Sequence, residues 1–75
     1  MPIEFSDHAK FQLKKRHISQ KLITEIVKNP DEIIVSFKNR RLRRKSVSGK
    51  ILQAVTITEG SRITVISGYY LRRKI

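Results

Sequence analysis

An apolar stripe near the start of the chain predicts a first helix. Phe5, Ala9 and Leu13 recur every four residues, a spacing that places them on one side of a helix. Ser6 directly precedes the first turn, and serine is a favoured N-cap because its hydroxyl accepts a hydrogen bond from a free backbone N–H. The pattern therefore predicts a helix over residues 6–16.

A second apolar stripe predicts a second helix. Ser19 is its N-cap, and Asn29-Pro30 ends it, because proline cannot sit inside a helix and disfavours helix in the residue before it. The helix is expected over residues 19–29. Its apolar members are Leu22, Ile23, Ile26 and Val27.

After Pro30 the pattern changes to short runs of β-branched and aromatic residues. Such runs, separated by Asn, Ser and Gly, are typical of strands joined by tight turns. The expected strands are residues 33–38, 41–47, 51–58 and 62–70. We expect the basic tail Arg72-Arg73-Lys74 to fray. Residues 1–75 are thus predicted to form one α+β domain, with two N-terminal helices packed on a four-stranded antiparallel sheet.

A two-residue turn at Asn39-Arg40 predicts the facing of the first hairpin. Phe37 then lies opposite Leu42 on the core face, and Val35 lies opposite Arg44. Lys38 opposite Arg41 is a destabilising like-charge pair, which favours an anionic partner for the other face. The basic residues on that face, away from the helices, are Arg41, Arg43 and Lys45.

A three-residue loop, Glu59-Gly60-Ser61, predicts the facing of the second hairpin. The opposite face then receives Arg62 and Tyr70, a cation and a stacking ring beside the basic residues. The predicted core positions of this hairpin are Val55, Ile57, Ile63 and Val65.

Most of the positive charge falls in the predicted sheet. The 75 residues include 17 Lys and Arg against 6 Asp and Glu, a formal net charge of +11. Residues 33–75 hold eleven basic residues and a single acidic one. Charge crowded into one half of a small domain indicates a polyanionic partner. A solubilising surface is the alternative, but solubility needs a net charge of only about 2–8.

The composition excludes several classes of protein. There is no cysteine, and no run of about 18 apolar residues that could span a membrane. We see no secretory signal, so we expect a cytoplasmic protein without a membrane partner. Two histidines and few carboxylates make a poor metal site, and no glycine-rich phosphate loop is present. No cofactor is expected.

The residue types that remain permit metal-free RNA cleavage, in which the 2′-hydroxyl attacks the adjacent phosphate. Cations stabilise the negative transition state and another group moves protons. Histidine, lysine or tyrosine can serve the second task, with His8 and Lys45 as candidates. His8, Gln12 and Arg16 recur every four residues at the expected edge of the helix–sheet contact. Packing roles for His8 and Arg16 are the alternatives. The candidate cations are Arg43, Arg44, Lys45 and Arg62.

Four short motifs, in this order, resemble a known family. They are Phe5-Ser6-Asp7-His8-Ala9, Arg16-His17-Ile18-Ser19, Asn29-Pro30-Asp31-Glu32 and Val65-Ile66-Ser67-Gly68-Tyr69. Together they are similar to a small prokaryotic domain-of-unknown-function family, related to BrnT within the RelE/ParE-like toxin superfamily. His17 stands where that family usually has glycine, and Ser67-Gly68 stands where it has Thr-Ala.

The resemblance implies a RelE/ParE-like fold and a toxin of a type II toxin–antitoxin pair. Such a toxin is an mRNA endonuclease, often on the ribosome, and an acidic antitoxin covers its basic face. The matched family positions are His8, Arg16 and Tyr69. The ParE branch inhibits gyrase instead.

Three hypotheses follow for the function. The first is an mRNA endoribonuclease, with His8, Arg16, Lys45 and Tyr69 as candidates for the chemistry. The second is a non-catalytic module that binds nucleic acid or the ribosome, and the third is a ParE-like gyrase inhibitor. The expected RNA contacts are Arg41, Arg43, Arg44, Lys45 and Arg62 on phosphates, with Tyr69 or Tyr70 stacked on a base.

Overall fold

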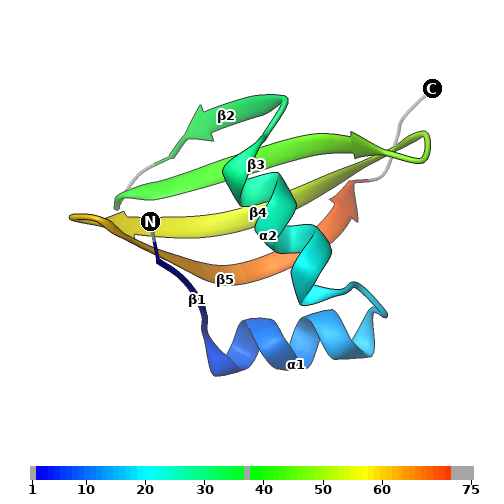
Figure 1. Cartoon of the computed structure of the whole chain (residues 1–75), viewed down its shortest axis with the longest axis horizontal. Helices are drawn as coiled ribbons and strands as arrows, with labels where there is room; N and C mark the ends of the chain where they lie inside the picture. Colours follow the sequence, from blue (N-terminus) through cyan, green and yellow to red (C-terminus); the bar gives the residue numbers. More distant parts are fainter. Residues whose placement is uncertain (1, 37, 72–75) are drawn as a thin grey trace.

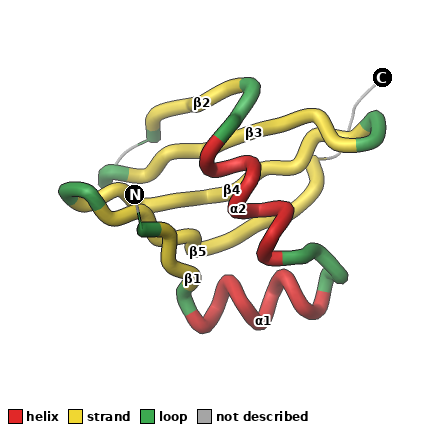
Figure 2. Tube along the Cα trace, in the orientation of Figure 1, coloured by secondary structure: helices red, strands yellow, loops and turns green. Residues whose placement is uncertain are grey.

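A computed structural model of the chain describes residues 2–36 and 38–71, so the basic tail Arg72-Arg73-Lys74 lies outside the described residues. Two helices pack on one sheet, whose strands lie in the order β1-β5-β4-β3-β2 (Figure 1). The elements are β1 (Ile3–Phe5), α1 (Asp7–Lys15), α2 (Gln20–Lys28), β2 (Glu32–Val35), β3 (Arg40–Val47), β4 (Lys50–Glu59) and β5 (Arg62–Leu71). In Figure 2, α2 crosses the sheet, whereas α1 runs along its β5 side.

Both helices begin at the predicted caps. The Ser6 hydroxyl accepts a 3.0 Å hydrogen bond from the Ala9 N–H, and the Ser19 hydroxyl accepts one of 3.0 Å from the Leu22 N–H. Each cap satisfies a helix donor that has no partner within the helix. Neither of these helices, in the part of the chain that the structure describes, has the length and apolarity to cross a membrane.

The turn between the helices depends on His17, which has a φ of 58°. The Ile18 N–H donates to the Leu13 carbonyl at 2.9 Å, and the His17 N–H donates to the Lys14 carbonyl at 3.2 Å. This pair of bonds is a Schellman motif, which ends a helix on a left-handed residue that is usually glycine. A histidine therefore occupies a backbone conformation that a Cβ atom disfavours.

The sheet is five-stranded and mixed, so the expected four-stranded antiparallel sheet is wrong. The additional strand, β1, runs parallel to β5, with Ile3 opposite Ile63 and Phe5 opposite Val65. Ile3 and Phe5 pack against the core. Three alternating residues are too short a pattern to distinguish from the start of the first helix. Their partner strand lies near the other end of the chain, so no neighbouring residues indicate the pairing.

The core lies between the two helices and one face of the sheet. Both helices approach the sheet closely at Gly68, because a Cβ atom there would lie 2.9 Å from Leu13 Cδ2 and 3.0 Å from Ile23 Cδ1. The helices leave the other face of the sheet uncovered, and we call it the helix-free face. The buried core residues are Ala9, Leu13, Ile18, Ile23, Ile26, Val27, Leu52, Ala54, Ile63 and Val65.

The first hairpin has a different register from the one expected. Val35 lies opposite Arg41, three residues from its predicted partner Arg44. The chain turns at Lys38 and Asn39, both with positive φ, one residue before the predicted turn. A slip by an odd number of residues exchanges the two faces of a strand. The predicted core marker Phe37 lies outside the described residues. The basic residues expected on the helix-free face, Arg41, Arg43 and Lys45, therefore lie on the helix side.

The second hairpin also differs in its facing. Glu59 pairs directly with Arg62, so the loop is shorter than predicted. A bulge at Ile66 follows from the pairing of Val55 with Ser67 and of Thr56 with Val65. Ile63 and Val65 lie in the core as expected, but they share that face with Leu52, Ala54 and Thr56. Val55 and Ile57 lie on the helix-free face instead.

Candidate nucleic-acid interface

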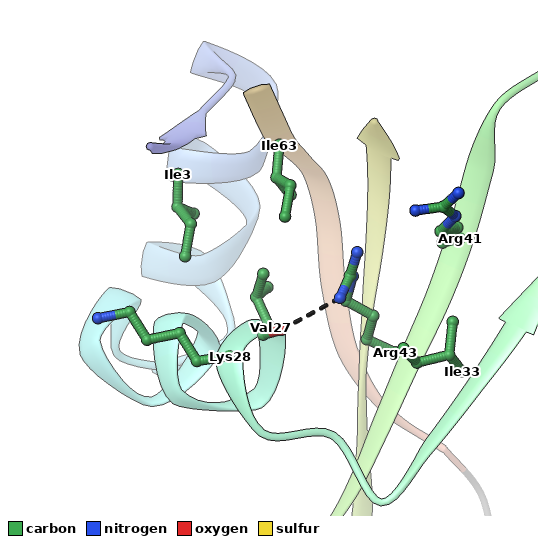
Figure 3. Close-up of a pocket in the computed structure, with 7 residues that line it drawn as sticks. All are labelled: Ile3, Val27, Lys28, Ile33, Arg41, Arg43 and Ile63. Carbon is green, nitrogen blue, oxygen red and sulfur yellow. Dashed lines mark hydrogen bonds between the residues drawn. The ribbon is translucent and has the colours of Figure 1, made fainter. Parts of the chain in front are cut away.

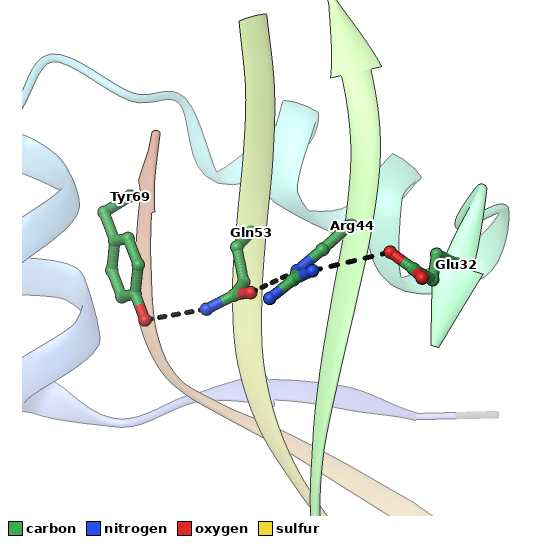
Figure 4. Close-up of polar contacts among 4 residues, drawn as sticks. All are labelled: Glu32, Arg44, Gln53 and Tyr69. Carbon is green, nitrogen blue, oxygen red and sulfur yellow. Dashed lines mark hydrogen bonds and ion pairs between the residues drawn. The ribbon is translucent and has the colours of Figure 1, made fainter. Parts of the chain in front are cut away.

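One side chain from each of four neighbouring strands forms a row across the helix-free face (Figure 4). The four residues are direct partners in the strand register, from β2 to β5. Gln53 Nε2 donates to Tyr69 Oη at 2.7 Å, and Arg44 Nε donates to Gln53 Oε1 at 2.6 Å. Arg44 Nη1 lies 3.5 Å from Glu32 Oε1. We call Glu32, Arg44, Gln53 and Tyr69 the polar row.

Gln53 fixes the geometry of the polar row. Only 3% of its surface is exposed, and both ends of its amide are hydrogen-bonded. Because the amide nitrogen donates to Tyr69 Oη, the phenol accepts there and keeps its own hydrogen for another acceptor. Arg44 donates from Nε to Gln53, and its Nη1 makes only a long contact to Glu32. The remaining N–H groups of the guanidinium can therefore bind an anion.

Arg16 joins the polar row from α1. Its Nη1 donates to the Gly68 carbonyl at 3.0 Å and to Gln12 Oε1 at 3.0 Å. Gln12 Oε1 also accepts from the Ser67 hydroxyl at 2.9 Å. These bonds hold α1 beside β5, beyond the end of β1. The Arg16 guanidinium carbon consequently lies 5.8 Å from the centroid of the Tyr69 ring, within range of a cation–π interaction.

The structure thus brings together Arg16, Tyr69 and Arg44, three of the predicted site residues. His8 lies on α1 with its side chain exposed, whereas Gln12 and Arg16 contact β5. Sequence reasoning missed Gln53, the residue that connects the polar row. The available signal was a glutamine between Leu52 and Ala54, because a polar residue in the middle of an apolar strand needs hydrogen-bond partners.

Arg43, predicted to contact phosphate, has a structural role instead. It is 7% exposed, and its guanidinium donates to the Val27 carbonyl at 3.1 Å and to Thr56 Oγ1 at 3.2 Å. The Val27 carbonyl is one of the last in α2, where a cation is favourable. Burial, and then the charge of Arg41, lower the pKa of Arg43.

Lys45 follows Arg44 in the chain but lies on the opposite face of β3, the helix side. Its ammonium donates to the Asn29 carbonyl at 3.1 Å and lies 3.6 Å from Asp31 Oδ1. The Ser46 N–H donates to Asp31 Oδ2 at 2.9 Å. That backbone bond is the main cause that lowers the pKa of Asp31. Desolvation opposes it in part, and the charge and hydrogen bond of Lys45 lower the pKa further. Lys45 therefore ties the segment before β2 to β3.

Two further predicted RNA contacts, Arg62 and Tyr70, are dispersed. Arg62 Nε pairs with Glu4 Oε2 at 3.0 Å, at the end of β5 that is remote from Tyr69. Tyr70 points to the helix side, opposite to Tyr69, with the Lys50 ammonium 5.5 Å from its ring centroid. Neither belongs to the polar row.

A second cluster of cations surrounds a groove on the helix side (Figure 3). The groove has a volume of about 540 Å³. Lys28, Arg41 and Arg43 supply its charge, over apolar side chains from β1, α2, β2 and β5. We call it the cationic groove. Its apolar lining consists of Ile3, Val27, Ile33 and Ile63.

Over residues 2–36 and 38–71, no three His, Asp or Glu side chains gather in a way that could hold a metal ion. The helix-free face offers two cations, an aromatic ring and its hydroxyl. No curated protein and no solved structure matches the chain. A family profile matches residues 5–69, a range that contains the whole polar row and Arg16. The chain belongs to that family, which is described as Domain of unknown function (DUF4258).

Proposed function

We propose that this protein is an mRNA endoribonuclease, the toxin of a type II toxin–antitoxin pair, and that it works on the helix-free face. One observation carries the proposal. Arg16 lies 5.8 Å from the centroid of the Tyr69 ring, and Gln53 connects the hydroxyl of that ring to Arg44, on a face that no helix covers. Cations near an aromatic ring are a combination with which proteins bind single-stranded RNA.

The proposed reaction needs no group beyond the RNA, water and these side chains. The 2′-oxygen forms a bond to the adjacent phosphorus, and the bond from phosphorus to the 5′-oxygen breaks. Water takes the proton of the 2′-hydroxyl, and Tyr69 Oη gives its proton to the departing 5′-oxygen. Arg44 and Arg16 stabilise the charge on the phosphoryl oxygens in the transition state. The products are a 2′,3′-cyclic phosphate and a 5′-hydroxyl.

The resemblance to BrnT-related members of the RelE/ParE-like superfamily supports this reading, because the matched positions include Arg16 and Tyr69. The structure supports a changed assignment of roles. Arg43 and Lys45 are committed to packing and to Asp31, so we assign neither to RNA. His8 is exposed and is retained only as a second source of protons.

Controlled expression in bacteria tests the proposal. We expect growth arrest with new mRNA 5′ ends that carry a hydroxyl, and we expect Arg44→Gln to abolish both. Lys50→Gln, an exposed cation on β4 outside the polar row, is the matched control and should stay toxic. Intact mRNA during growth arrest would contradict the proposal, and DNA damage in that case would favour a gyrase inhibitor. RNA that is bound but not cut by the purified protein would indicate a binding module.

A further inference from the structure

The cationic groove lacks a negative partner in the described chain. None of its described lining residues is acidic, and the side chains of Arg41 and Arg43 donate three hydrogen bonds to neutral oxygens. The two guanidinium groups also repel each other, which contributes to the lowered pKa of Arg43. An anion at this position would reduce that repulsion and gain charge-assisted hydrogen bonds.

The groove adjoins an unprotected edge of the sheet. β2 is the last strand in the sheet order, so only β3 pairs with it among the described strands. The Ser36 N–H donates to the Arg40 carbonyl, and the alternation of an antiparallel ladder then turns the N–H groups of Ile33 and Val35 outward. Such outward groups are a template for another strand.

The side chains at this edge are apolar and accessible. Ile33 is 47% exposed and Val35 is 75% exposed, and both lie on the helix side, directly opposite Arg43 and Arg41. Sheet edges are normally protected by charge, proline or a bulge, because an open apolar edge invites pairing. β2 carries one charged residue, Glu32, and that side chain lies on the other face with Arg44.

From the groove and the edge together, we propose that β2 receives an extended acidic segment of a partner protein as an additional strand. Glu or Asp residues of that segment alternate with apolar ones, and the carboxylates lie over Ile33 and Val35 toward Arg41. Arg and Glu side chains are long enough to meet across two strand spacings of about 4.8 Å each. Main-chain hydrogen bonds supply affinity and the alternating side chains supply specificity.

Charge and composition favour an acidic segment over a second copy of the chain and over RNA. A second copy pairing through β2 would place two cationic grooves side by side, in a chain whose net charge is already +11. Proteins bind the bases of single-stranded RNA by stacking them on aromatic rings, and none of the described residues that line the groove is aromatic. An acidic extended segment satisfies the cations and the free edge together, and its alternate apolar side chains lie on the other face, beside Ile34.

If the protein is the toxin of a pair, as proposed above, the acidic segment belongs to the antitoxin; the binding surface itself is inferred from the groove and the edge alone. RNA and the peptide are assigned to opposite faces of one sheet. A protein that cuts no RNA can still bind the peptide, and one that cuts RNA can fail to bind it. RNA cleavage therefore tests the proposed function, and peptide binding tests the proposed docking surface, independently of each other.

The test uses the purified full chain and a fluorescent peptide of about eight residues in which Glu and Val alternate, long enough to cover an edge strand. Fluorescence anisotropy should show binding that weakens with salt, and the same peptide with Gln in place of Glu should bind at least about ten times more weakly. Arg41→Glu should reduce affinity at least about ten-fold, because it replaces the accessible cation with a like charge. Val35→Pro should do so as well, since it removes an outward N–H and leaves the bonds to β3 intact.

Lys50→Glu is the matched control, because it makes the same charge change at the other end of the β3–β4 ladder, opposite Val47. Its affinity for the peptide should stay within about two-fold of the wild-type value, because salt screens a distant charge. No binding of the peptide, or equal binding by Arg41→Glu, would overturn the proposal. Displacement of the peptide by a short oligouridylate would assign the groove to RNA. A dimer in analytical ultracentrifugation that Val35→Pro dissolves would assign the edge to a second copy.

Discussion

Gln53 donates its side-chain amide to the phenolic oxygen of Tyr69 at 2.7 Å, across the β4–β5 pair. The carbonyl of the same amide holds Arg44 from the other side. A cation on β3 and a hydroxyl on β5 are thereby positioned by one buried residue between them. Groups fixed in this way act on a substrate without first being reorganised.

The coupling between Gln53 and Tyr69 can be measured. Gln53→Met keeps the side-chain volume but removes the amide, and Tyr69→Phe removes only the hydroxyl. We expect the two losses in unfolding free energy to overlap by about 1 kcal/mol in a double-mutant cycle, because both remove the same hydrogen bond. Urea unfolding of the four proteins gives this number. Losses that add to within about 0.3 kcal/mol would show that the bond does not form in solution.

His17→Gly should stabilise the protein. The left-handed backbone at this residue costs a side chain with a Cβ atom about 1 kcal/mol relative to glycine, and the Schellman bonds do not involve the imidazole. The unfolding free energy should therefore rise by up to about 1 kcal/mol in urea titrations. His17→Ala is the control, because it retains the Cβ atom. If alanine stabilises as much as glycine, strain at this turn is not the cause.

Arg43 and Arg41 should differ in their importance for stability. Arg43→Met leaves the Val27 carbonyl at the end of α2 without its donor, so we expect a loss of about 1–3 kcal/mol. Arg41→Met changes an exposed residue and should stay within about 0.5 kcal/mol. Thermal and urea unfolding would compare the two. Equal effects would indicate that Arg43 is as dispensable as a surface cation.

Asp31 should make stability depend on pH in the acid range. Its pKa is lowered in the folded state, so its contribution is complete above the unfolded-state pKa of about 3.9 and is lost as the pH falls through the folded value. Asp31→Asn should flatten the fall in unfolding free energy over that range. Lys45→Met should keep most of the dependence, because the Ser46 N–H is the larger cause. A profile for Asp31→Asn with the wild-type slope would contradict this origin.

Local chemistry made the helices predictable. Both caps, Ser6 and Ser19, and the stop at Asn29-Pro30 act within a few residues of the helix end, so the sequence alone locates them. The predicted strand ranges also lie close to the observed β2–β5, because β-branched runs and turn residues are local signals. Helical spacing predicted Arg16 and Gln12 at the edge of the helix–sheet contact, and their bonds to Gly68 and Ser67 confirm this.

The facing of the strands depended on details that the sequence does not show. Positive φ at Lys38 and Asn39 moved the first turn and exchanged the faces of β3, which placed Arg44 on the helix-free face and Arg41 and Arg43 on the helix side. The bulge at Ile66 did the same for part of the second hairpin. β1 pairs with β5 over nearly the whole length of the chain, and no local pattern reports such a contact.

The proposed RNA cleavage on the helix-free face can be measured with the purified protein and a short single-stranded RNA under single-turnover conditions. We expect Tyr69→Phe to slow cleavage at least about 100-fold, as for the loss of a proton donor, and Arg41→Gln on the helix side to cleave at the wild-type rate. Added chelator should leave the wild-type rate unchanged. Cleavage by Tyr69→Phe at the wild-type rate, or its loss in Arg41→Gln alone, would place the chemistry away from the helix-free face.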